Sequence, residues 1–174
     1  ETLTTIPIDF PSGNNSEKYT DKVTVSLSEE ETELLFQEFL HSYRINVEEV
    51  LLTSLVHSIA EWTGSDQLVV NIEGHGREEI LENLDLTRTV GWFTSLFPVK
   101  LKKGKDIRNT LRDIKETIRS MPNKGVDYGI LRYLNKETSD ILKNNIQPSI
   151  SFNYLGQFNN DNKGDSIFTT SEEL

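Results

Sequence analysis

The stretch Gln67-Leu-Val-Val-Asn-Ile-Glu-Gly-His-Gly-Arg-Glu78 decides how this chain folds. It begins with branched and apolar side chains, which are typical of a mostly buried strand. After Glu73 it continues with glycine and charged residues, which predicts that the strand opens directly into a loop. A strand end of this kind delivers side chains from a rigid element into a cleft. We therefore expect a functional site where this strand ends.

Strand and helix signals alternate on both sides of this stretch. Alternating or β-branched runs predict further strands at Val23–Leu27, Thr94–Leu101 and Ser149–Leu155. Capping residues and apolar spacings of three and four predict helices from Ser28 to about His41, from Asn46 to about Trp62 and from Ile107 to just before Pro122, with short helices at Tyr128–Tyr133 and Thr138–Leu142. The alternation predicts an α/β fold, most simply a two-layer sandwich of helices on one sheet.

The same spacings predict which helix residues face the core. They are Leu34, Leu35, Phe36 and Phe39 in the first helix, Val47, Val50, Leu51, Leu55 and Ile59 in the second, and Ile107, Leu111, Ile114 and Ile118 in the third. Gly64 is expected to end the second helix.

Composition excludes several classes of protein. Among 174 residues, 28 acidic side chains outnumber 18 basic ones, which argues against binding to nucleic acid or to an anionic membrane. The absence of cysteine excludes disulfides, thiolate nucleophiles and cysteine-ligated metal sites. The longest apolar stretch without charge, Val50–Ala60, is too short to span a bilayer. We expect a soluble, cytoplasmic protein.

The ends of the chain differ in composition from its centre. Prolines, glycine and small polar residues between Ile6 and Ser16 predict an extended linker over residues 1–20. Residues 159–174 are polar and predict a loosely ordered tail. Residues 21–158 would form the folded part. Because Glu1 is not an initiator, we expect a piece of a longer protein.

The polar residues after the first strand are the first candidate site. In an extended chain Glu73, His75 and Arg77 share one face. They suit either a cleft or an ordinary turn held by an ion pair. A zinc site is not expected, because Glu73 and His75 supply only two ligands while His41 and His57 lie on helices. Gly74 and Gly76 lack the third glycine of the dinucleotide-binding motif, so nucleotide binding is not expected.

Two aromatic segments are the other candidates. Residues 88–99 contain Trp92 and Phe93 in an uncharged loop, which predicts either core packing or the lining of an apolar tunnel. In Phe152–Phe158, the polar groups of Asn153 and Tyr154 need hydrogen-bond partners if they are buried.

Taken together and in this order, the sequence motifs of these segments indicate a family more specifically than any one of them alone. Four motifs are involved: Glu73-Gly-His-Gly-Arg-Glu78, Thr89-Val-Gly-Trp-Phe-Thr94 with Phe97-Pro98, Pro122-x-x-Gly125-x-x-Tyr128-Gly129, and Phe152-Asn-Tyr-Leu-Gly-Gln157. The chain resembles, from about Ile6 to Phe158, the epimerization domains of nonribosomal peptide synthetases, which belong to the condensation-domain superfamily. The sequence of residues 85–99 resembles the epimerization branch more than ordinary condensation domains.

The resemblance implies a fold and a set of partners. Family domains consist of two lobes similar to chloramphenicol acetyltransferase, which meet in a V around a tunnel. This chain resembles the C-terminal lobe, so residues 21–158 would form that lobe in incomplete form. The His-His-x-x-x-Asp motif of the first lobe does not occur here. The expected partners are that first lobe and a peptidyl carrier protein, and the isolated chain is expected to be inactive.

The resemblance also implies an activity. An intact domain of this kind converts an L-aminoacyl or peptidyl thioester to the D form by removing and returning the α-proton. Glu73 and Tyr154 match positions implied to be catalytic, and His75, Arg77, Trp92 and Asn153 match positions implied to bind or position the substrate. No metal or directly bound cofactor is implied, because the substrate is tethered to the phosphopantetheine arm of the carrier.

Two other functions remain open. A condensation domain would form peptide bonds between two carrier-bound substrates. A non-catalytic docking module would only bind a carrier protein or a neighbouring domain. Because the chain is acidic, docking would need a local basic face, for which Lys100–Lys105 with Arg108 and Arg112 are the candidates.

Overall fold

The computed structural model describes residues 6–78, 85–144 and 147–156, and its centre is a three-stranded sheet. Strand β1 (Gln67–Gly74) lies in the middle, antiparallel to β2 (Ser95–Lys102) and parallel to β3 (Ser151–Phe152). The first two match their predicted ranges to within one residue. The third is much shorter than predicted, because only Asn71 and Ile72 of β1 pair with it.

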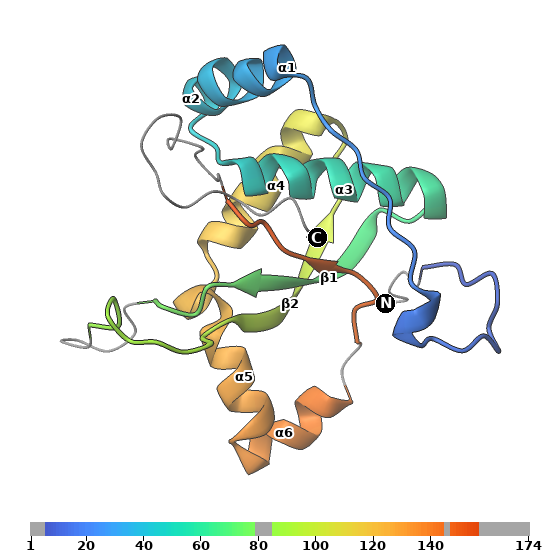
Figure 1. The fold of residues 1–174 in the computed structure, drawn as a ribbon, viewed down its shortest axis with the longest axis vertical. Coiled ribbons are helices and arrows are strands. Elements are labelled where there is room, and N and C mark those ends of the chain that lie inside the picture. The colour runs from blue at the N-terminus through green and yellow to red at the C-terminus, as the bar shows by residue number, and fades with distance from the viewer. Residues whose placement is uncertain (1–5, 79–84, 145–146, 157–174) are drawn as a thin grey trace, which may run out of the picture.

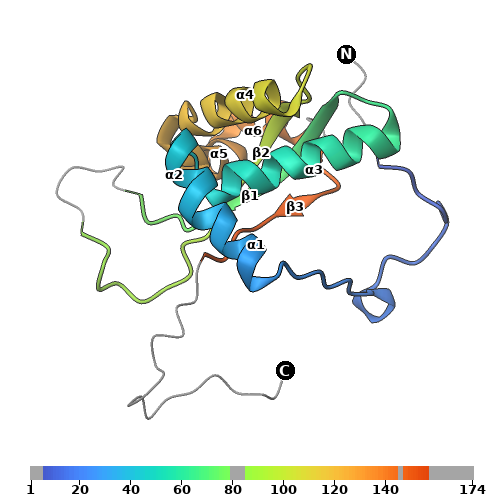
Figure 2. The same cartoon turned by 90° about the horizontal axis from the view of Figure 1, so that it is seen from above.

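Two long helices form the second layer. Figures 1 and 2 show α3 (Val47–Thr63) and α4 (Ile107–Arg119) together on one side of the sheet. The remaining helical elements are η1 (Glu17–Tyr19), α1 (Glu29–Glu33), η2 (Leu34–Phe39), α2 (Leu40–Tyr43), η3 (Pro122–Gly125), α5 (Val126–Tyr133) and α6 (Lys136–Lys143). The helix predicted from Ser28 is therefore continuous to Tyr43, with one π-helical section, η2, in its middle.

Both predicted capping boxes are present. At the start of α3, the Asn46 side chain accepts a hydrogen bond from the Glu49 backbone N–H at 2.9 Å, and the Glu49 carboxylate accepts from the Asn46 N–H at 3.1 Å. Ser28 and Glu31 make the same pair of bonds at the start of α1. Gly64, at φ 72°, ends α3 as predicted.

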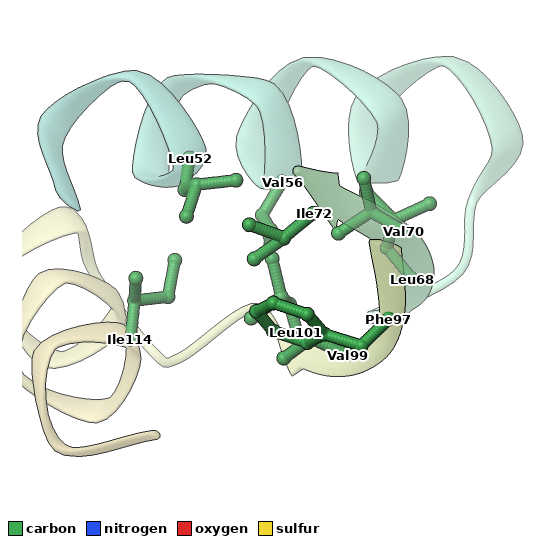
Figure 3. Packing of buried hydrophobic residues seen from close by; sticks show 9 residues of the cluster. All are labelled: Leu52, Val56, Leu68, Val70, Ile72, Phe97, Val99, Leu101 and Ile114. Carbon is green, nitrogen blue, oxygen red and sulfur yellow. The ribbon is translucent and has the colours of Figure 1, made fainter. Parts of the chain in front are cut away.

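The core fills the space between the two helices and the sheet. Every second residue of β1 and β2 points toward the helices, and the register pairs Leu68 with Leu101 and Ile72 with Phe97. Figure 3 shows nine buried side chains of this cluster: Leu52, Val56, Leu68, Val70, Ile72, Phe97, Val99, Leu101 and Ile114. This is the expected two-layer α/β packing.

The predicted inner face of α3 was displaced by one residue. The buried apolar side chains are Leu52, Val56 and Ala60, whereas Leu51 is 39% exposed. Leu55 and Ile59 only border the core, and Val47 and Val50 are half-buried. The helix is apolar over most of its circumference, so spacings of three and four fit two neighbouring stripes. Contact with the sheet and α4 selects between them.

Other burial predictions were wrong where no partner covers the side chain. Leu34 is 55% exposed and Ile107 60%, although Ile114 is buried as predicted. Ile118 packs against the core as predicted. Leu35, Phe36 and Leu111 are half-buried, and the side chain of Phe39 lies outside what the structure describes.

The strand predicted at Val23–Leu27 was also wrong. This segment forms no strand, and Val23 and Val25 are 88% and 87% exposed. Alternation alone does not make a strand, because its backbone needs an edge to pair with, and none of the described strands pairs with it.

The described N-terminal residues before α1 contain a turn closed by a hydrogen bond from the Gly13 N–H to the Phe10 carbonyl, and the short helix η1. The tail predicted at residues 159–174 lies outside the described residues. Within the described part, no helix has both the length and the apolar character needed to cross a membrane.

Candidate functional site

A pocket of about 560 Å³ lies where β1 ends. Its walls come from the end of β1, the segment after β3, and the facing ends of α3 and α4, so it is lined from both faces of the sheet. Five of the six predicted site residues line it: Glu73, His75, Trp92, Asn153 and Tyr154. The sixth, Arg77, does not. The sheet thus brings together segments about 80 residues apart in the chain.

Among the residues that the structure describes, the Glu73 carboxylate has one side-chain hydrogen-bond partner. The parallel pairing of Ile72 with Phe152 places Asn153 beside Glu73, and the Asn153 amide donates a hydrogen bond to Glu73 Oε2 at 2.8 Å. No ion pair with arginine holds Glu73 among the described residues. The carboxylate is positioned by a neutral amide and retains acceptor capacity toward the pocket.

Both ring nitrogens of His75 are engaged. Nδ1 accepts a hydrogen bond from the Arg77 backbone N–H at 3.0 Å, so a neutral ring carries its proton on Nε2. Nε2 lies 3.0 Å from Glu78 Oε1, and Glu78 Oε2 lies 3.3 Å from Lys124 Nζ. Protonating Nδ1 would break the bond to the backbone. His75 therefore stabilises the turn after β1 rather than presenting a free base.

Arg77 acts on the neighbouring loop. Its guanidinium donates to the carbonyl oxygens of Leu86 at 2.7 Å, Thr89 at 2.9 Å and Gly91 at 3.4 Å. It also lies over the ring of Phe93, 4.3 Å from the centroid. The expectation that Arg77 shares a face with Glu73 was wrong, because the strand ends at Gly74. Backbone carbonyls hold Arg77, and the ion-pair contacts of the turn are made instead by Glu78 with His75 and Lys124.

Gly76 is what allows this turn. Its φ is +66°, and a β-carbon there would overlap the carbonyl oxygen of Phe93. The turn directs residues 77 and 78 away from the line of β1.

The two aromatic residues of the loop differ in exposure. Trp92 is 90% exposed and borders the pocket, which excludes core packing for it in this chain. Phe93 is half-buried beneath Arg77. In Figure 2 this loop, residues 85–94, extends away from the helices. Tyr154 also borders the pocket and is half-buried.

The sequence did not identify two charged residues of the pocket, Glu48 and Lys124. Burial raises the pKa of Glu48, the charge of Glu49 adds to this, and Lys124 opposes it. Glu48 was assigned only to the start of a helix, and Lys124 lies in η3 with φ +47°. No local pattern marks either one, because both reach the pocket only when α3 and α4 pack on the sheet.

No group of three or more metal-ligating side chains occurs in the described part of the chain. His57 instead lies partly buried on α3, with Nε2 2.9 Å from the hydroxyl of Thr110 on α4. This matches the prediction that His57 lies on a helix.

Comparison with known proteins identifies the family. The model of the condensation domain matches residues 1–173. The chain belongs to the condensation-domain family. Relatives of this condensation-family chain include two bacterial synthases. The chain is 47% identical to surfactin synthase subunit 1 of Bacillus subtilis (strain 168) over 96% of its length, and 43% identical to gramicidin S synthase 1 of Brevibacillus brevis over 94%. It spans only 5% and 15% of the lengths of those proteins.

A solved structure supports the fold of this condensation-family chain. The epimerization domain from the third module of tyrocidine synthetase B superposes with a TM-score of 0.83 at 38% identity. The match covers 91% of this chain and 37% of that one. It confirms the predicted α/β fold of the condensation and epimerization domains, and the chain corresponds to a fragment of such a domain.

Proposed function

We propose that the complete domain containing this chain epimerizes an aminoacyl or peptidyl thioester carried by the phosphopantetheine arm of a carrier protein. The observation that carries the proposal is the Glu73 carboxylate, which lines the pocket at the end of β1 and is held by Asn153 at 2.8 Å. The similarity to a tyrocidine synthetase epimerization domain supports it.

Epimerization needs one group to take the α-proton and another to return a proton to the opposite face. When the Cα–H bond breaks, its electron pair moves into the thioester and forms an enolate. Returning a proton to the other face restores the thioester with inverted configuration, so the reaction involves no net oxidation. The Glu73 carboxylate is one proton-transfer group in this scheme. A histidine of the first lobe, outside this chain, is the other.

The remaining residues have supporting roles. Tyr154 borders the same pocket, and its hydroxyl can donate a hydrogen bond to the thioester oxygen as negative charge develops there. Asn153 orients Glu73, while His75 and Arg77 hold the turn and the loop that carries Trp92. No directly bound cofactor takes part in this scheme.

The test is Glu73→Gln in the full-length protein with its loaded carrier. Chiral chromatography of the released residue would measure L-to-D conversion, and we expect a loss of at least about 100-fold, as for removal of a general acid or base. Glu116→Gln, which removes the same charge from the exposed side of α4, is the control and should keep full activity. Unchanged conversion by the Glu73 variant would rule out the proposed role.

Condensation is the second candidate, favoured by the family model itself. A condensation domain joins the substrates of two carriers. Supplying one carrier and measuring chirality, then two carriers and measuring peptide, separates the two activities. Peptide formation without inversion would replace epimerization as the function.

A further inference from the structure

A second pocket, of about 490 Å³, lies beside the one at the end of β1. Its walls include Asn71 of β1, Leu96 of β2 and several residues of α5, and Thr94 lines both pockets. The helical wall contains Tyr128 and Gly129 of the third sequence motif. Neither the second pocket nor this motif has a role in the proposed function.

The register of the sheet places the second pocket next to Glu73. Leu96 pairs directly with Glu73, so their side chains lie on one face of the sheet, with β-carbons about 5 Å apart. Asn71 precedes Glu73 by two residues and therefore points to the same face. This face is opposite to the one that carries the core, because Ile72 and Phe97 point toward the helices. The second pocket thus borders the Glu73 carboxylate.

The two neighbours of Glu73 across the sheet differ in polarity. On the β3 side, the Asn153 amide donates to the carboxylate at 2.8 Å, and Tyr154 follows in the chain. On the β2 side lies the apolar Leu96, which leads into the second pocket. A substrate with its α-carbon at Glu73 would meet hydrogen-bonding groups in one direction and this pocket in the other. The thioester suits the first direction, and the side chain suits the second.

The walls of the second pocket suit an uncharged side chain. Ile130 and Leu134 line it and are 49% and 78% exposed, so their apolar atoms are open to a ligand. The Arg132 guanidinium is already engaged, because it donates to the Leu142 carbonyl at 2.7 Å and to the Tyr128 hydroxyl at 3.3 Å. No acidic side chain is among the described residues of these walls. A basic side chain would therefore lack a counter-ion there.

Gly129 keeps the helical wall of the second pocket open. It lies inside α5 without a positive φ, and a β-carbon there would meet nothing within 4 Å outside its own helix. Glycine is unfavourable inside a helix compared with residues that have a side chain. Gly125 differs, because its φ is +82° and a β-carbon there would overlap the ring of Phe97. Backbone conformation and close packing explain Gly125, whereas beside Gly129 there is open space.

We propose that the second pocket receives the side chain of the residue that is inverted, so that the domain prefers large apolar or aromatic side chains over small or basic ones. The inference rests on the proposed function, because it places the α-carbon of the substrate at Glu73. Gly129 is then a specificity-determining residue, since the missing side chain leaves room for that of the substrate. A pocket of this volume is of ordinary size for a ligand site.

Binding is measured separately from turnover. Unreactive pantetheine amides of L-phenylalanine and L-alanine are titrated into the full-length protein by calorimetry. Burial of the ring should make the phenylalanine ligand bind about 10-fold more tightly. Gly129→Leu fills the space and should bring this ratio close to one, and Gly129→Ala should give an intermediate ratio. Ser58→Leu introduces the same side chain at an exposed position of α3 and should preserve the ratio.

A third ligand tests the preference against charge. The pantetheine amide of L-lysine has a long side chain that ends in an ammonium group. Binding no tighter than that of the alanine ligand supports a pocket for apolar side chains. Binding as tight as that of the phenylalanine ligand overturns this preference.

The remaining outcomes keep the two proposals apart. Equal binding of the phenylalanine and alanine ligands by the wild type, or a preference that survives Gly129→Leu, overturns the role of the second pocket and leaves epimerization in place. A lower melting temperature of the Gly129→Leu protein also overturns it, because another part of the domain would then already fill the space. A preference that depends on Gly129 in a protein that never converts L to D residues supports the pocket and contradicts epimerization instead.

Discussion

Two regions that meet at the start of α3 treat neighbouring carboxylates in opposite ways. In the interface between α3 and α4, Glu49 is fully buried, and its oxygens contact the Arg119 guanidinium at 2.7 and 3.2 Å. In the pocket, Glu48 has no hydrogen bond or ion pair among the described residues, and only the charge of Lys124 acts favourably on its ionised form. The comparison teaches that this fold pairs the carboxylate buried between its helices and leaves the one that lines the pocket without a hydrogen bond from any described residue.

The largest loss of stability is expected when the ion pair between Glu49 and Arg119 is removed. Arg119→Met leaves Glu49 buried without its cation and should lower the free energy of unfolding by about 3 kcal/mol, measured by urea denaturation of the domain. Arg112→Met is the control, because Arg112 is exposed and its ion pair within the described chain is with the exposed Asp113, so about 0.5 kcal/mol or less is expected. Equal losses would mean that the α3–α4 pair is not special.

The pocket depends on the backbone conformation of the turn at Gly76. Substituting Gly76 and, for comparison, Gly64 by alanine tests this dependence. Gly76→Ala should destabilise the domain by about 2 kcal/mol, because the new β-carbon meets the Phe93 carbonyl in addition to the strain of a positive φ. Gly64 has a similar φ, +72°, but open space around it, so Gly64→Ala should cost about 1 kcal/mol. Thermal unfolding measures both. A larger loss for Gly64 would contradict the close approach seen at Gly76.

A third change loosens the pocket loop without removing charge. Arg77→Lys keeps the cation but cannot reach three carbonyl oxygens with one planar group. Hydrogen exchange of the amides between Thr87 and Phe93, followed by mass spectrometry, should become about 10-fold faster. Arg88→Lys is the control, since Arg88 is exposed in the same loop. Unchanged exchange would show that the loop is held by other contacts.

The smallest effect should come from Glu48 itself. Because the pKa of Glu48 is raised in the folded protein, folding binds its proton more tightly than the unfolded chain does. The contribution of Glu48 to the free energy of unfolding therefore falls as the pH rises from its ordinary carboxyl pKa, in the unfolded chain, through its raised pKa in the folded protein. Glu48→Gln removes the penalty and should stabilise the domain at pH 7 by less than about 1 kcal/mol.

Melting temperatures from pH 3.5 to 7.5 test this sign. The difference in melting temperature between Glu48→Gln and wild type should disappear as the pH falls below about 4, because Glu48 then becomes protonated in both the folded and the unfolded state. A constant difference across the range would show that lost charge is not the cause. Glu29→Gln, at an exposed position in the first turn of α1, controls for the general effect of removing an acidic residue near a helix start.

Local signals predicted the elements and part of the site. The capping boxes at Ser28 and Asn46 located two helix starts, and the β-branched run before Glu73 located β1 with its polar exit. Five of the six predicted site residues line one pocket, and the pairing of β3 with β1 places Asn153 and Tyr154 beside Glu73 there. The errors arose where a pattern fitted more than one partner, as on α3, or had none among the described residues, as at Val23–Leu27.

The sequence by itself determined where the strands and helices lie, that the chain has the fold of the condensation-domain family, and which acid ends β1. These features depend on helix capping, apolar periodicity and sequence motifs, each of which can be read from residues close together in the chain. Only the tertiary structure decided that Arg77 binds backbone carbonyls, that His75 is held by its neighbours, and that Glu48 and Lys124 enter the pocket. Such roles depend on which charges the packing of α3, α4 and the sheet brings together, and on how far each is removed from water.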